Sequence, residues 1–143
     1  MALNTINLPF SPAQEDANNV KFRTSVLPEV FPAGDCRMKD GAILTIHNNG
    51  SVSFLASLRT TVSGPGQDVW HQRFEVCDAQ GQLLFRLPPH LTPLGHQPSW
   101  WDQDVGHWVE EGVFPFKMIV SFDSQFDVAL WDRISFVTWF GDC

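Results

Sequence analysis

Residues 42–62 read AILTIHNNGSVSFLASLRTTV, and this stretch decides the fold class. Ala42 to His47 is rich in β-forming residues, the turn formers Asn48-Asn49-Gly50 follow, and a second such run begins at Ser51. An Asn-Gly pair accepts the positive φ of a tight turn at low cost, so the two runs predict a β-hairpin. In the second run alternate positions are mostly apolar and predict a buried face, made of Val52, Phe54, Ala56, Leu58 and Val62.

Similar short runs, bounded by Gly, Pro, Asn and Asp, recur along the chain. They predict strands at residues 20–26, 42–47, 51–62, 68–77, 82–87, 105–110, 113–122 and 134–140. One helical turn is expected within residues 123–131, with Asp123 or Ser124 as its cap. Many short strands separated by turns are typical of sandwiches and barrels. We therefore expect an all-β fold, a single-domain antiparallel β-barrel or β-sandwich of about 8–9 strands.

Length and composition bound the domain organisation. The chain has 143 residues, 43% of them hydrophobic, which is the size of one domain and enough apolar surface for a core. Residues 1–19 lack sustained periodicity and predict an extended N-terminal arm, held by Ile6, Leu8 and Phe10, ahead of a β domain over 20–143. The formal net charge of −7 argues against binding nucleic acid through its phosphates.

Targeting signals are not evident in the sequence. No stretch approaches the roughly 20 apolar residues of a membrane-spanning helix. The N-terminus also lacks the basic start and apolar run of a signal peptide. We expect a cytoplasmic protein, or one exported without such a peptide, and no membrane span.

The cysteines favour free thiols over a disulfide framework. There are three of them, Cys36, Cys77 and Cys143, an odd count with wide spacing and no C-x-x-C motif. We therefore expect reduced thiols and no cysteine metal site. A Cys36–Cys143 bridge is the alternative, because Gly-Asp-Cys occurs at both 34–36 and 141–143.

The most informative segment for function is residues 88–108, which is rich in Trp, His and Asp. A segment of this length without strand periodicity is typical of a lid or a binding loop. Indoles beside carboxylates suit stacking on a sugar, an aromatic molecule or a cation. The alternative is that these indoles close one end of the barrel. The candidate ligand-binding residues are Trp100, Trp101, Trp108, His96, Asp102 and Asp104.

A metal site in the same segment is the weaker interpretation. His90, His96 and His107 with a nearby Asp supply ligands that zinc or iron accepts. Their spacing matches no known metal-binding motif, so we expect no metal and no cofactor.

An enzymatic alternative rests on His71 and Glu75, which share one face of the strand at 68–77 with Arg73. If that face lined an aromatic cavity, the two side chains would be a proton-transfer couple for cofactor-free cyclase or isomerase chemistry on a hydrophobic substrate. If it faces water, they are ordinary surface charges. Because no nucleophile motif such as G-x-S-x-G occurs, we lean against an enzyme.

A third class is a bacterial interaction, immunity or toxin-like module. The strand at 134–140 carries large side chains on both faces, so it is either buried on both sides or part of an interface, such as that of a homodimer. The favoured expectation remains a ligand-binding β module for a glycan or a hydrophobic or aromatic small molecule.

Residues 31–87 carry a family resemblance. Along the sequence the motifs follow in the order F-x-x-G-D-C, a predicted strand, N-N-G-S-V-S-F, D-V-W, and D-A-Q-G before a final predicted strand. It resembles a family of small bacterial all-β proteins known only as a domain of unknown function. The resemblance implies a β fold and a bacterial source, and it carries over no catalytic residue.

Overall fold

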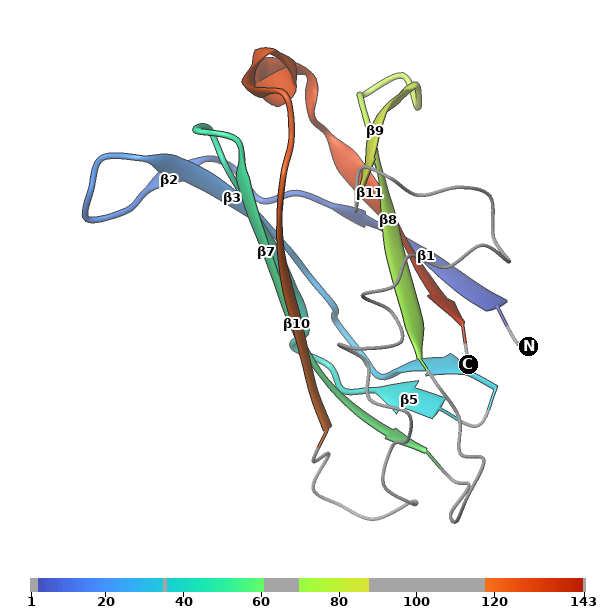
Figure 1. Cartoon of the computed structure of the whole chain (residues 1–143). Helices are drawn as coiled ribbons and strands as arrows, with labels where there is room; N and C mark the ends of the chain where they lie inside the picture. The colour runs from blue at the N-terminus through green and yellow to red at the C-terminus, as the bar shows by residue number, and fades with distance from the viewer. Residues whose placement is uncertain (1–2, 35, 61–69, 88–117, 143) are drawn as a thin grey trace.

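The computed structural model describes residues 3–34, 36–60, 70–87 and 118–142, and they form two antiparallel sheets (Figure 1). The four-stranded sheet has the order β1 (Leu3–Pro9), β11 (Phe136–Asp142), β8 (His71–Cys77) and β9 (Leu83–Leu87). The seven-stranded sheet has the order β2 (Gln14–Glu15), β3 (Lys21–Val26), β6 (Ile43–His47), β7 (Ser51–Thr60), β5 (Cys36–Met38) and β4 (Phe31–Ala33), and β10 (Met118–Gln125) pairs with the other edge of β7.

The expected all-β fold is confirmed, and it takes the form of an open sandwich instead of a closed barrel. The described residues contain eleven strands, more than expected. The additional strands are β1, which lies in the expected arm, and β2, β4 and β5, which have only two or three residues each and are too short to produce a period in the sequence. The expected strand at 105–110 lies outside the described residues.

The hairpin of residues 42–62 forms as predicted. β6 pairs with β7 from Ile43 opposite Leu55 to Ile46 opposite Val52. Gly50 has a φ of 93° and its N–H donates to the carbonyl of His47 at 3.0 Å. β7 then runs through the centre of its sheet, because β6 and β5 share one of its edges and β10 takes the other.

Aromatic side chains from both sheets fill the space between them. Phe54 from β7 meets Phe74 from β8 and Trp139 from β11, with ring centroids 5.0–5.7 Å apart and edge-to-face geometry. The Trp139 indole N–H donates to the Ser25 hydroxyl across the sandwich at 3.0 Å. Among the described residues, the remaining fully buried large side chains are Leu27, Met38, Leu44, Ile46, Leu58, Trp70, Gln72 and Leu87.

The expected N-terminal arm, residues 1–19, contributes a strand to each sheet. β1 pairs with β11 over its whole length, from Leu3 opposite Asp142 to Pro9 opposite Phe136. Leu8 and Phe10 are buried in the core, as the sequence predicted. The described part of this segment is therefore continuous with the sandwich.

The expected helical turn is present but begins later than predicted. It is the 3₁₀ helix η1 (Val128–Arg133), capped by Asp127, whose carboxylate accepts from the Ala129 N–H at 3.0 Å. Neither Asp123 nor Ser124 caps it, because both belong to β10 and pair with Ser53 and Val52 of β7. The strand ladder satisfies backbone groups that a helix start would leave open.

The two ends of the sandwich differ in their connections (Figure 1). One end carries the turn at 48–50, the turn at 78–81 and η1. At the opposite end, which we call the loop end, β7 ends at Thr60 and β11 at Asp142, while β8 begins at His71 and β10 at Met118. β9 stops short of this end, because Leu87 pairs with Phe74 in the middle of β8. Residues 61–69 therefore connect two strands at the loop end, and residues 88–117 return to the sandwich there at Met118.

The expectation of three reduced thiols is wrong. Cys36, fully buried at the start of β5, is disulfide-bonded, whereas Cys77 is a free thiol. Cys143 lies outside the described residues. The alternative of a bridged Cys36 is the correct one for this residue. Spacing along the chain could not decide between the two, because a disulfide depends on which strands the fold brings together.

Candidate functional site

The six predicted ligand-binding residues, Trp100, Trp101, Trp108, His96, Asp102 and Asp104, lie outside the described residues. The positions where their segment joins the sandwich are described. Leu87, its preceding residue, is fully buried opposite Phe74 of β8. Met118, its following residue, lies opposite Leu58 of β7. The segment therefore leaves an edge strand of one sheet at mid-height and returns to an edge strand of the other sheet at the loop end.

The predicted catalytic strand β8 begins at the same end. His71, Arg73 and Glu75 lie on its outer face, while the inner face carries Gln72, Phe74 and Val76, all fully buried. On the neighbouring strand β11, the outer positions opposite them are Asp142, Phe140 and Thr138. We call these six residues the β8–β11 outer face.

His71 and Glu75 do not form a direct couple. They are four residues apart on one strand, which separates their α-carbons by roughly 13 Å. Glu75 is engaged elsewhere, because one of its carboxylate oxygens accepts from Nε of Arg86 on β9 at 2.8 Å. The face does not line a barrel interior, since it is the outer side of the four-stranded sheet. The catalytic role of these two residues stays a prediction.

Arg73 is the least exposed cation of this face, at 9%. Its guanidinium lies over the ring of Phe140, 4.8 Å from the centroid, a cation–π contact that offsets part of the cost of burying the charge. Burial lowers the pKa of Arg73, while the Glu75 carboxylate raises it and Arg86 lowers it. Arginine nevertheless stays charged at neutral pH, so this is a fixed positive charge beside the loop end.

Asp142 and Phe140 are members of this face that the sequence did not single out. Asp142 is only 4% exposed and lies directly opposite His71 on the neighbouring strand. Strand pairing therefore places Asp142 closer to His71 than Glu75, which is four residues away on the same strand. Cross-strand partners are closer than residues four apart on one strand. The pairing of β8 with β11 joins residues that are about 60 to 70 positions apart in the sequence, and no local periodicity indicates it.

Beneath this face, a buried polar pair holds the start of β8. The Trp70 indole N–H donates to Oε1 of Gln72 at 3.0 Å, and Nε2 of Gln72 donates to the Arg73 carbonyl at 3.4 Å. Trp70 and Gln72 are both fully buried. Satisfied polar groups in a core fix a single arrangement, so His71 and Arg73 stand on a rigid base.

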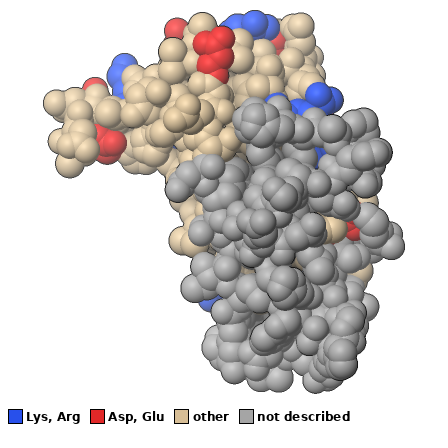
Figure 2. Space-filling view, in the orientation of Figure 1, with Lys and Arg blue, Asp and Glu red and all other residues tan. Residues whose placement is uncertain are grey.

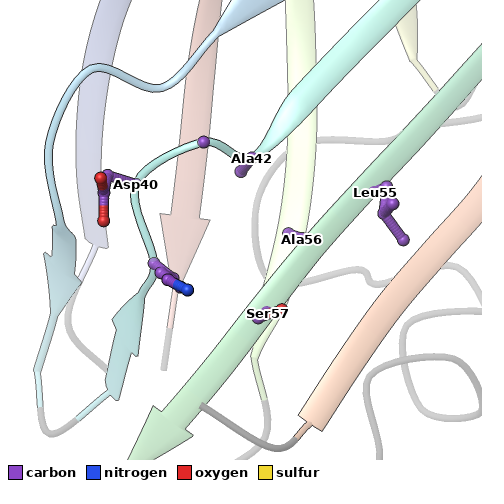
Figure 3. A pocket seen from close by; sticks show the side chains of 7 residues that line it. Asp40, Ala42, Leu55, Ala56 and Ser57 are labelled. Carbon is purple, nitrogen blue, oxygen red and sulfur yellow. The ribbon is translucent and has the colours of Figure 1, made fainter. Parts of the chain in front are cut away.

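A shallow pocket lies elsewhere, on the seven-stranded sheet (Figure 3). It has a volume of about 190 Å³ where β7 changes partner from β6 to β5. In Figure 3 Asp40 on the turn and Leu55 on β7 do not point toward one another. Typical ligand sites are larger and bring polar groups together, so we assign this pocket no function. Its lining residues are Lys39, Asp40, Gly41, Ala42, Leu55, Ala56 and Ser57.

The expected dimer strand, residues 134–140, is an inner strand. β11 is hydrogen-bonded to β1 on one side and β8 on the other, so neither of its edges is open to a second chain. Val137 and Trp139 face the core, whereas Phe136 and Phe140 are half-buried on the outer face. Only this outer face remains for a partner, and the homodimer stays a prediction.

Charge and metal-binding groups are dispersed over the described residues. In the face shown in Figure 2, the described Lys and Arg side chains form no broad patch. Within the described ranges, no three His, Cys, Asp or Glu residues are grouped so as to hold a metal ion. The same part of the chain contains no helix with the length and apolarity needed to cross a membrane.

The free thiol of Cys77 predicts a pH dependence of stability. Burial raises the pKa of Cys77 above its ordinary value of 9.0, and the carboxylates of Glu75 and Asp78 raise it further. The folded chain therefore holds this proton more tightly than the unfolded chain. The resulting stabilisation is fully present below about pH 9 and is lost as the pH rises through the folded-state pKa.

Denaturant unfolding at about pH 8 and about pH 10 measures this effect. We expect the free energy of unfolding to fall between the two pH values by more in the wild type than in Cys77→Ala. The comparison uses the change with pH, so a constant cost of the substitution cancels. Equal changes in the two proteins would contradict the assignment.

Comparison with known proteins adds one family. The family model described as a family of unknown function, DUF6294, matches residues 43–143. This range includes residues 43–87 of the stretch that carries the resemblance and continues through the Trp-, His- and Asp-rich segment. No curated protein and no solved structure matches the chain.

Proposed function

The chain belongs to DUF6294, a family of unknown function, and we propose that it is a ligand-binding module that takes a glycan or an aromatic small molecule at the loop end. One observation carries the proposal: the Trp-, His- and Asp-rich segment rejoins the sandwich at the same end at which β8 begins. It leaves the sandwich at Leu87, opposite Phe74 of β8, and rejoins it at Met118, at the loop end where β8 starts at His71.

The packing of the sandwich supports a site outside the core. Trp70, Phe74, Leu87 and Trp139 are fully buried and fill the space between the sheets. A ligand would therefore bind over the strand ends and not between the sheets. β-sandwiches commonly carry their binding residues on the loops at one end, where a rigid scaffold positions them.

The chemistry of the site follows from its residue types. Trp100, Trp101 and Trp108 would stack on the ring of the ligand, and His96, Asp102 and Asp104 would hydrogen-bond its polar groups. Arg73 adds a fixed cation and His71 a titratable group at the foot of the site. Indole stacking together with carboxylates suits a neutral sugar better than an anion, since carboxylates repel negative charge.

Fluorescence titration of the full chain against a panel of neutral oligosaccharides and aromatic small molecules tests the proposal. For any compound that binds, we expect Trp100→Ala and Trp101→Ala to raise the dissociation constant about tenfold or more, because each removes a stacking surface. Unchanged affinity in both variants would contradict it.

Trp131→Phe is the matched control. Trp131 lies on η1, at the end of the sandwich opposite the loop end, and it is partly exposed. Removing this indole changes the fluorescence but leaves the proposed site intact, so the dissociation constant should stay within about twofold. An equal loss of affinity in Trp131→Phe would show that the effect of the other two variants is not local.

A further inference from the structure

Two parts of the loop end that belong to different sheets lie against each other. The end of β11 meets β4, because a Cβ added at Gly141 would come within 2.6 Å of Cε1 of Phe31. The start of β1, paired with the end of β11, is tied to β4 as well, since Nδ2 of Asn4 donates to the Pro32 carbonyl at 2.7 Å. β4 and β5 pair with Ala33 opposite Cys36. Cys36 is therefore close to the end of β11.

The cysteine inventory identifies the second half of the bridge. Cys36 is disulfide-bonded, Cys77 is free, and the sequence contains three cysteines. The remaining one, Cys143, directly follows Asp142, the last residue of β11. We propose that a Cys36–Cys143 disulfide is a redox-sensitive lock that joins the two sheets at the loop end.

The shortness of β4 and β5 explains why a covalent bond would stabilise this end of the sandwich. β4 and β5 have three residues each, so few backbone hydrogen bonds hold them. β5 pairs with β7 only at Cys36, Arg37 and Met38. Elements with so few contacts open at low free energy, and a covalent bond limits that opening. The bridge also closes a loop of roughly 100 residues, which restricts the unfolded chain strongly.

The chemistry of unlocking is a two-electron reduction. A dithiol reductant attacks one sulfur, the S–S bond breaks, and the reductant closes to a cyclic disulfide. The two protein sulfurs together gain two electrons and two protons and become thiols. Because Cys36 is fully buried, the attack requires local opening of the loop end, so reduction of the native protein is slower than reduction in denaturant.

Three measurements on the wild-type chain test the lock without relying on any variant to fold. Thiol titration in denaturant should find one free thiol per chain, and three after reduction. Peptide mapping under non-reducing conditions should recover the peptide of Cys36 linked to that of Cys143. Thermal unfolding with a dithiol reductant should lower Tm by about 10–15 °C. Three free thiols in the oxidised chain, a bridge to Cys77, or an unchanged Tm would overturn the proposal.

Hydrogen exchange measures where the lock acts. After reduction, the amides of residues 31–38 and of the end of β11 should exchange faster, while those of the turns at 48–50 and 78–81 should not change. Uniform acceleration at both ends would overturn the local role. Cys77→Ala is the control and should lose the same Tm on reduction as the wild type. Cys36→Ser should already have the lower Tm and should not respond to the reductant.

Discussion

Trp139→Ala is expected to lower the free energy of unfolding by about 3–5 kcal/mol, the range observed when a large aromatic side chain is removed from a core. Trp139 is fully buried and contacts Phe54 and Phe74 edge to face, so it joins the two sheets at their centre. Its removal also leaves the buried Ser25 hydroxyl without the indole donor. Urea or guanidinium unfolding of the two proteins gives the difference.

Trp139→Phe separates packing from hydrogen bonding. It keeps an aromatic ring in the core but removes the indole N–H, so we expect a loss of about 1–3 kcal/mol, smaller than that of Trp139→Ala. A loss below about 1 kcal/mol in Trp139→Ala would mean that this cluster does not hold the sheets together.

Gly141→Ala is expected to have the second largest effect, about 2–3 kcal/mol, because one added carbon overpacks the core. That carbon would overlap Cζ2 of Trp70 and lie 2.6 Å from Cε1 of Phe31. Both rings belong to buried side chains, so neither can move away cheaply. Chemical unfolding of the variant, with the slope of the transition checked against the wild type, measures the loss.

Gly81→Ala is the matched control for the loss of a glycine. Gly81 has a φ of 83° and nothing lies within 4 Å of a Cβ placed there, so the substitution costs backbone strain alone, about 1 kcal/mol. Gly141 has the opposite character, a close approach without a positive φ. If Gly141→Ala cost no more than Gly81→Ala, the close contact of β11 with Trp70 and Phe31 would be incorrect.

Local patterns predicted the strands that are long enough to show a period. Alternation placed Val52, Phe54, Ala56 and Leu58 of β7 on the inner face, and all four are buried. The predicted cap of η1 was wrong. Asp123 and Ser124 have side chains suited to capping a helix, but both residues belong to β10 and pair with β7. Tertiary pairing outweighs a local capping preference, and a single sequence does not report that pairing.

The candidate site, too, could be predicted from the sequence only in part. The common face of His71, Arg73 and Glu75 follows from the period of two within β8, and the structure has it so. The neighbours of that face do not follow, because Phe140 and Asp142 come from β11 and Arg86 from β9. The cysteine bridge was only an alternative to three free thiols for the same reason. Contacts between distant strands depend on register, which has no signature in the spacing of residues along the chain.

The pairing of β1 with β11 has a consequence for synthesis on the ribosome. β1 is synthesised long before β11, and among the described residues its only partner in the four-stranded sheet is the strand formed by residues 136–142. The hairpin of β6 and β7 can form while the chain is still being made, because its strands are adjacent in sequence. The β1 edge of the four-stranded sheet can form only after translation has passed residue 142. Leu8 and Phe10, which are buried in the folded protein, stay exposed to solvent until then. Chains of this topology fold slowly and expose apolar strand edges on the way, so the nascent form is expected to be prone to aggregation.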